Sequence, residues 1–95
     1  MIRHIVMFWL KDNSPESVEA AAARLRSMRG QIEGMVELEV GADFLHSGRS
    51  CDLCLTTLFE TREALDAYRT HPVHLPVQAY MHSVREKSCA ADYEV

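Results

Sequence analysis

The sequence predicts a single α+β domain whose elements run strand-helix-strand-strand-helix-strand. Apolar residues alternate in four short segments, as in strands, and recur at three- and four-residue steps in two others, as in helices. A chain of 95 residues forms one compact domain, which we assign to residues 1–95. With 47% hydrophobic and 25% charged residues, the composition is that of an ordinary globular protein.

Residues 2–10 are the first expected strand, because branched and aromatic side chains dominate them. Side chains alternate between the two faces of a strand. One face carries Ile2, His4, Val6, Phe8 and Leu10, and the other carries Arg3, Ile5, Met7 and Trp9. Both faces are largely apolar, so we expect both to be covered.

The first helix is expected to begin at Ser14, which caps it, with Pro15 in the first helical position and Glu16 near the positive end. Its apolar residues recur at helical spacing up to Gly30, a usual signal for a helix end. These residues are Val18, Ala21, Ala22, Leu25 and Met28.

Two further strands follow. The second opens at Gly34 and has one expected buried face, formed by Val36, Leu38 and Val40. Residues 41–50 are typical of a loop. The third strand covers residues 51–59 and places on one face Leu53, Leu55, Thr57 and Phe59.

A short helix capped by Thr61 precedes the segment His71–Pro76, in which two prolines stand four residues apart. The residue before a proline avoids the helical region, and a proline four residues into a helix clashes with the preceding turn. We therefore expect an irregular corner here, with the helix resuming from about Pro76 through His82. The last strand is expected over Ser88–Glu94.

Two strand-helix-strand units predict a ferredoxin-like βαββαβ arrangement, a four-stranded antiparallel sheet with its helices on one face. The other face would keep an apolar patch of Ile5, Met7, Trp9, Cys54 and Leu58. Single chains rarely expose a patch of this size, so we expect a homodimer formed through it. For Trp9 a role in the dimer interface is favoured over stacking on a ligand.

Composition and charge exclude several classes of function. The formal net charge is −4 and no basic stripe occurs, which argues against nucleic acid. No apolar run approaches the roughly 20 residues of a membrane span, and the first residues lack a cleavage site, so we expect a cytoplasmic protein. Cys51 and Cys54 have C-x-x-C spacing, but we interpret them as small apolar residues, because strand positions three apart point to opposite faces.

The corner Tyr68-Arg69-Thr70-His71-Pro72-Val73-His74, in this order of elements, resembles the stress-responsive α/β-barrel domain family, called Dabb. The similarity extends over nearly the whole chain and includes His4, Gly41, Asp52, Phe59-Glu60, Leu65 and Asp92-Tyr93. The resemblance implies a ferredoxin-like subunit and a dimeric α+β barrel made by two sheets packed face to face. One plant member of the family is a polyketide cyclase that uses a tyrosine and the second histidine of the corner. Those catalytic roles would fall here on Tyr68 and His74.

The leading hypothesis is a small apolar pocket between sheet and helices that binds a carbonyl or polyketide-like ligand, with Tyr68 and His74 at its mouth. An imidazole of ordinary pKa could accept a proton at neutral pH. If the protein is an enzyme, the resemblance implies cyclase-like acid-base chemistry without cofactor or metal. The expected ligand-binding residues are His4, Val6, Phe8, Leu25, Leu53, Leu55 and His71.

Other interpretations fit the same residues. In a non-catalytic structural or stress-associated homo-oligomer, His71 would cap a turn and His74 would bond the backbone at the helix start. A small cofactor-free monooxygenase of the same architecture is another alternative function, because the fold does not determine the chemistry. A metal held by both corner histidines is disfavoured by the prolines, and His46 and His82 are expected on the surface. A void of roughly 300 Å³ or more beside His74 would favour ligand binding.

Overall fold

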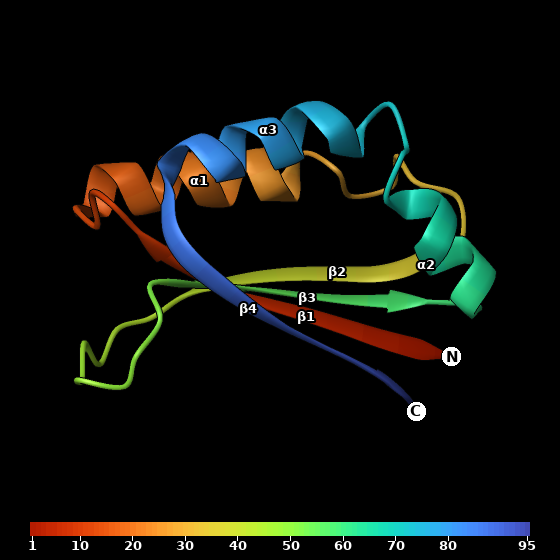
Figure 1. Cartoon of the computed structure of the whole chain (residues 1–95), viewed down its shortest axis with the longest axis horizontal. Helices are drawn as coiled ribbons and strands as arrows, with labels where there is room; N and C mark the ends of the chain where they lie inside the picture. Colours follow the sequence, from red (N-terminus) through yellow and green to blue (C-terminus); the bar gives the residue numbers. More distant parts are fainter.

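The computed structural model describes all 95 residues, and its elements follow the predicted order, with the second helical region split in two (Figure 1). In chain order these are β1 (Ile2–Leu10), α1 (Pro15–Arg26), β2 (Met35–Ala42), β3 (Leu53–Phe59), α2 (Arg62–Tyr68), α3 (His74–Val84) and β4 (Arg85–Glu94). Ser14 and Thr61 cap α1 and α2 with their hydroxyl groups, as the sequence predicts. None of the helices is both long and apolar enough to cross a membrane.

The four strands form one sheet in the order β2-β3-β1-β4, and every neighbouring pair is antiparallel. Figure 1 shows α1 and α3 lying along the same face of this sheet, while α2 lies at the end where both chain termini are found. This arrangement confirms the ferredoxin-like α+β fold. The central strand β1 is paired along both edges, which fixes the position of each of its side chains.

The hydrophobic core lies between the sheet and the helices. The inner face predicted for β3 is confirmed, because Leu53, Thr57 and Phe59 are fully buried and Leu55 nearly so. Thr57 is the one buried polar residue, and its hydroxyl donates a hydrogen bond of 3.0 Å to the carbonyl oxygen of His4. The bond satisfies the hydroxyl and ties β3 to the strand that carries the candidate site.

The prediction for the inner face of β2 is wrong at Val36, whose surface is 49% exposed. The pairing of β2 with β3 shifts between Met35 and Glu37, so one extra residue is inserted there. Such a bulge reverses which residues point inward on its two sides. Leu38 and Val40 lie beyond it and are buried, as predicted.

Three element boundaries also differ from the prediction. Helix α3 begins at His74, so the irregular corner covers only residues 71–73. Pro76 is then the third residue of the helix, where its missing N–H group would have no partner in any case. Strand β3 begins at Leu53 instead of Cys51, and β4 begins at Arg85, directly after α3.

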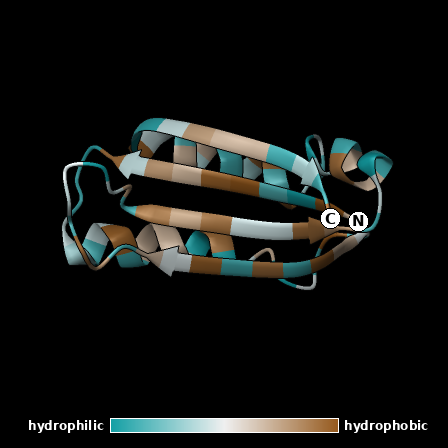
Figure 2. Ribbon diagram, turned by 90° about the horizontal axis from the view of Figure 1, so that it is seen from below, coloured by the Kyte–Doolittle hydropathy of each residue, from teal (hydrophilic) through white to brown (hydrophobic).

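The face of the sheet opposite the helices is uncovered. Figure 2 shows this face, with hydrophobic residues on the two central strands, β1 and β3. Met7 is 40% exposed, and Ile5, Trp9 and Cys54 are half-buried in the single chain. The indole of Trp9 donates to the carbonyl of Ser50 at 2.8 Å, which holds it against the sheet.

Gly34 offers a test of how tightly β2 and α2 are packed. Its φ is +80°, and a Cβ added there would lie 2.5 Å from the Cβ of Ala64. Gly30 has a similar φ of +74° but open space around it, and Gly41 has open space and no positive φ. We expect Gly30→Ala to lower the free energy of unfolding by about 1 kcal/mol and Gly34→Ala to lower it by more, since strain and clash add. Gly41→Ala should have little effect. Urea unfolding measures all three, and equal losses at positions 30 and 34 would contradict the close contact.

Candidate functional site

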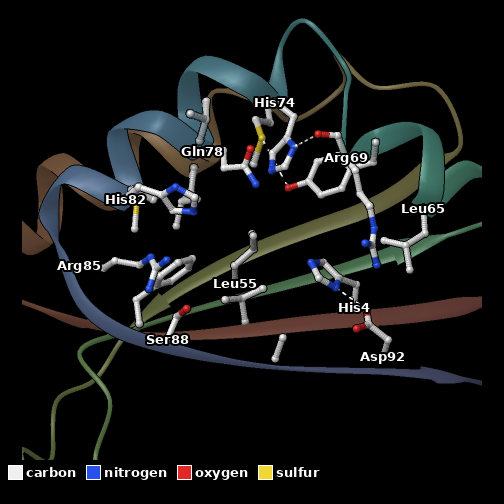
Figure 3. A pocket seen from close by; sticks show the side chains of 18 residues that line it. His4, Leu55, Leu65, Arg69, His74, Gln78, His82, Arg85, Ser88 and Asp92 are labelled. Carbon is white, nitrogen blue, oxygen red and sulfur yellow. Dashed lines mark hydrogen bonds and ion pairs between the residues drawn. The ribbon is translucent and has the colours of Figure 1, made fainter.

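A cavity of about 350 Å³ lies between the helices and the covered face of the sheet. In the close view of Figure 3, α3 lies on one side of it and the strands on the other. Ten of its 18 lining residues are hydrophobic, and the remainder bring a few polar groups together, which is the usual make-up of a small-molecule site. The volume exceeds the roughly 300 Å³ expected of a ligand-binding cavity beside His74.

The sheet side of the cavity is built from directly paired residues of β1 and β4. Their register places Asp92 opposite His4, Ala90 opposite Val6 and Ser88 opposite Phe8. All six line the cavity, because residues two apart in a strand point to the same face. Polar groups therefore lie at both ends of this wall, and small apolar side chains lie between them.

The helix side of the cavity comes mainly from α3. His74, Gln78 and His82 are spaced four residues apart, so they lie along one side of the helix and form a polar row beside the cavity. Figure 3 shows the three side chains extending from α3 towards the strands. Leu25 and Met28 of the α1 region close the back of the cavity with apolar surface.

The imidazole of His74 is held by two contacts. Its Nδ1 donates to the carbonyl oxygen of Arg69 at 3.3 Å, and its ring stacks on Tyr68 with the centroids 3.9 Å apart. Because a carbonyl can only accept, the proton of the neutral ring resides on Nδ1 and the lone pair on Nε2. Burial lowers the pKa of His74, so the neutral form prevails at pH 7.

Tyr68 is buried beneath this imidazole, with 4% of its surface exposed. Its ring also packs against Phe59, with the centroids 5.1 Å apart. Burial raises the pKa of Tyr68 to about 12, so its hydroxyl keeps its proton at every physiological pH. Its contact with the sulfur of Met28, at 3.8 Å, is weak, so the hydroxyl can still donate to a ligand oxygen.

His4 enters the cavity from the opposite side, in β1. Its Nδ1 is hydrogen-bonded to the carboxylate of Asp92 on β4, as drawn in Figure 3. A carboxylate bound at one ring nitrogen orients the imidazole and leaves the other nitrogen for a second partner. The His4 ring lies edge-on to Tyr68, with the centroids 6.1 Å apart. Both imidazoles therefore lie at the same end of the cavity, next to the tyrosine.

Most of the expected site residues come together in the structure, but two do not line the cavity. His71 accepts a hydrogen bond from the backbone N–H of Val73 at Nδ1 and donates from Nε2 to Glu33, both at 3.0 Å. It therefore holds the corner in shape, as the non-catalytic interpretation supposed. Leu53 is fully buried in the core beneath the cavity.

Sequence reasoning missed several lining residues. His82, expected only at the surface, is exposed but also lines the cavity. The four-residue steps from His74 through Gln78 to His82 could have indicated this. The other missed polar residues are Arg69, Gln78, Arg85, Ser88 and Asp92, and the missed apolar ones are Met28, Leu65, Val77, Met81 and Ala90. Of these, Ser88 and Asp92 follow from the alternation of β4, whereas Arg85 does not.

The cysteines and histidines elsewhere show no sign of a second reactive centre. Cys51 and Cys54 are both unpaired and half-buried. Burial, and to a smaller extent the neighbouring Cys54, raise the pKa of the Cys51 thiol, whereas reactive cysteines have a lowered pKa. No three His, Cys, Asp or Glu side chains lie together in a way that could hold a metal ion.

Comparison with known proteins agrees with this architecture. The model of the stress responsive A/B barrel domain family, Dabb, matches residues 2–95. The chain belongs to this family. The Dabb assignment confirms the resemblance found in the sequence, and it covers the whole of the fold described above. No curated protein matches the chain in sequence.

Solved structures with the same fold include another Dabb protein. A dimeric ferredoxin-like protein of unknown function from Thermobifida fusca is 23% identical over 99% of this chain and 90% of that one, with a TM-score of 0.88. A Dabb family protein from Mesorhizobium loti is 25% identical over 99% and 95% of the two chains, with a TM-score of 0.83. A hydroxynitrile lyase from Passiflora edulis is 17% identical over 99% and 92%, with a TM-score of 0.84. Proteins of this fold thus include dimers and an enzyme.

The lowered pKa of His74 predicts a pH dependence of stability. An imidazole whose pKa falls on folding binds protons more readily in the unfolded chain. Its contribution to the free energy of unfolding is therefore complete above the unfolded pKa of 6.5, and it is lost as the pH falls from there towards the folded pKa. We therefore expect the free energy of unfolding to decline between about pH 7 and pH 5, and to decline less steeply in His74→Asn. Urea unfolding over this range measures both slopes. Parallel curves for the two proteins would show that His74 is not buried as described.

Proposed function

We propose that the protein binds a small carbonyl compound in the cavity and catalyses proton transfer at the carbon next to the carbonyl, without a cofactor. The observation that carries the proposal is the stacked pair of Tyr68 and His74 at one end of a cavity of about 350 Å³. A fixed, neutral imidazole and a protonated phenol are the two groups that enolisation requires. The membership of the Dabb family supports it through the matching Tyr and His positions of the corner.

The roles of the two groups follow from their protonation states. Nε2 of His74 takes the proton from the carbon next to the carbonyl, and the electron pair of the broken C–H bond moves into the enolate. The hydroxyl of Tyr68 donates a hydrogen bond to the oxygen where negative charge develops. In a condensation the enolate carbon attacks a second carbonyl of the same ligand, and His74 returns its proton to the new alkoxide.

His4 and Asp92 are placed to assist this chemistry. The hydrogen bond to the Asp92 carboxylate orients the His4 ring and leaves its other nitrogen free to bind the ligand oxygen. Because His4 faces the cavity from the strand side and His74 from the helix side, a flat carbonyl group can lie between them (Figure 3). The Passiflora hydroxynitrile lyase supports only the more general point that this fold can carry an enzyme.

The rival interpretation, a non-catalytic homo-oligomer, is favoured by one observation, the structural role of His71 at the corner. It requires a filled interior, however, and offers no use for the polar groups that face the cavity. His74 differs from His71 in this respect, because only one of its ring nitrogens has a partner within the protein. The pocket therefore favours the binding and catalytic proposal.

Deuterium exchange tests the proposed chemistry directly. The protein should accelerate exchange of the protons next to the carbonyl of 4-phenyl-2-butanone in D₂O, followed by proton NMR. His74→Asn removes the base but keeps an amide N–H that can donate to the Arg69 carbonyl. We expect it to lower the exchange rate at least about 100-fold, the usual contribution of a positioned acid or base. Tyr68→Phe keeps the stacked ring and should also lower the rate.

His46→Asn is the matched control for this experiment. His46 is exposed in the loop before β3 and lies outside the cavity, and asparagine tolerates its positive φ of 54°. The control should exchange the ketone as fast as the unmodified protein. Exchange that is absent in the unmodified protein, or equal in His74→Asn, would rule out the proposed reaction for this class of ligand.

We also propose that the protein forms a homodimer through the uncovered face of the sheet. Solved structures of the same fold from Thermobifida fusca and Bacteroides fragilis are described as dimeric, which supports this arrangement. The accessible part of the predicted patch, Ile5, Met7, Trp9 and Cys54, would be its centre, whereas Leu58 is already buried in the single chain. Covering it removes apolar area from water, which is the usual source of the stability of such interfaces.

Met7→Glu tests this interface. Met7 is 40% exposed in the single chain, so a carboxylate there can remain solvated when the chain is alone but not when a second sheet covers it. We expect Met7→Glu to sediment as a monomer at concentrations where the unmodified protein is a dimer. Leu75→Glu, at a residue 47% exposed on α3, is the control and should remain dimeric. A Met7→Glu protein that sediments as a dimer would contradict the interface.

A further inference from the structure

We propose that the ligand of this cavity carries a carboxylate, and that Arg85 binds it at the end remote from His74. The inference rests on the proposed function and deepens it, because it names the substrate class as an extended oxo-carboxylic acid. The carbonyl would lie between His4 and His74, and the carboxylate would lie against Arg85, His82 and Ser88. Apolar side chains would contact the carbon chain between them.

The backbone at Arg85 is shaped so that this side chain faces inward. By simple alternation from Ser88, Ala90 and Asp92, residue 86 would share their face and residue 85 would point to the other side. The pairing of β1 with β4 shifts between Trp9 and Leu10, which places Arg85 opposite the buried Leu10. A β-bulge of this kind re-aims a side chain. In Figure 3 the guanidinium of Arg85 accordingly lies beside Ser88 in the cavity.

Arg85 is held firmly at this position. It is the residue at which α3 ends and β4 begins, and its backbone N–H donates to the carbonyl of Met81 in the last turn of the helix. Its Cα is paired with that of Leu10 across the sheet. The backbone of Arg85 is therefore fixed, so that ligand binding has to order only its side chain.

The guanidinium of Arg85 has no partner within the protein, although the residue is half-buried. It takes part in none of the ion pairs. The other arginines bind carboxylates, backbone carbonyls or an aromatic ring, namely Arg3, Arg24, Arg26, Arg29, Arg62 and Arg69. Only Arg49 also lacks such a partner, and it is exposed on a loop. An arginine that is half-buried at a cavity without a counter-charge is suited to binding an anion.

The charges around the cavity favour an anion at the Arg85 end. Asp92 is the only carboxylate among the lining residues, and it is bound to His4 at the other end. Arg69 lies at that other end as well, but it is exposed and lies 4.0 Å from Asp66. Positive charge is therefore concentrated without compensation at Arg85, in a protein whose formal net charge is −4.

The length of the cavity sets the shape of the ligand. His74 and His82 are eight residues apart on α3, which corresponds to roughly 12 Å along the helix axis. A carbonyl near His74 and a carboxylate near Arg85 are thus separated by several carbon atoms. Val6, Leu55 and Met81 line this stretch with apolar surface, and Gln78 of α3 is the polar residue between the two histidines. This arrangement suits an oxo acid whose two oxygen-bearing ends are joined by an apolar chain or ring.

A matched pair of probes tests the assignment. The carboxylate 5-oxo-5-phenylpentanoate and its primary amide have nearly the same shape and differ in charge. Titration calorimetry at low salt should show that the unmodified protein binds the carboxylate at least about 10-fold more tightly than the amide. Arg85→Gln should lose this preference, whereas Arg49→Gln removes the same charge from an exposed loop and should keep it. Urea unfolding confirms that both variants are folded.

Other outcomes separate this inference from the proposed reaction. Equal binding of the two probes, survival of the preference in Arg85→Gln, or its loss in Arg69→Gln alone would overturn the role of Arg85. The His74→Asn variant should keep the preference for the carboxylate, because its base is at the other end. If that preference is present but no ketone exchange occurs, the carboxylate site stands and the reaction falls. If ketone exchange occurs but the protein shows no preference for the carboxylate, the reaction stands and the carboxylate site falls.

Discussion

The central position of β1 is the constraint on which the site depends. Because this strand is paired with β3 on one edge and β4 on the other, each of its inward side chains has a fixed neighbour on both sides. His4 is thereby placed beside Asp92, and the hydroxyl of Thr57 holds the backbone of His4 from the β3 side. The helices α2 and α3 then place Tyr68 and His74 opposite a strand surface whose geometry is already fixed.

Burial favours the uncharged form of both Tyr68 and His74, although it moves their pKa values in opposite directions. It lowers the pKa of His74 and raises that of Tyr68 to about 12, and in both cases the uncharged form is favoured. A base and a hydrogen-bond donor can therefore coexist in contact without exchanging a proton. Their stacked rings show that the tyrosine positions the imidazole through packing, and its hydroxyl remains available to a ligand.

Much of this could be predicted from the sequence, because the signals were regular. Alternation in residues 2–10 gave both faces of β1, and the corner motif brought Tyr68 and His74 together. The two bulges were not visible, since no residue type marks the place where an extra residue enters a strand. The bulge in β2 accounts for Val36, and the bulge in β4, together with a strand that begins three residues earlier than expected, accounts for Arg85. His82 was missed for a different reason, because the expected helix began only at Pro76 and so left His74 outside the four-residue spacing that leads to His82.

The wall formed by β4 has a hydrogen-bonded neighbour along one edge only. β4 is an edge strand, so the backbone groups of its outer edge have no partner in the single chain, and nearly all of its residues are exposed. Outward bending of this one strand would widen the cavity and move Asp92 relative to His4, while His74 and Tyr68, which lie on other elements, would keep their geometry. The cavity could thus accept ligands of different width while Tyr68 and His74 stay in place.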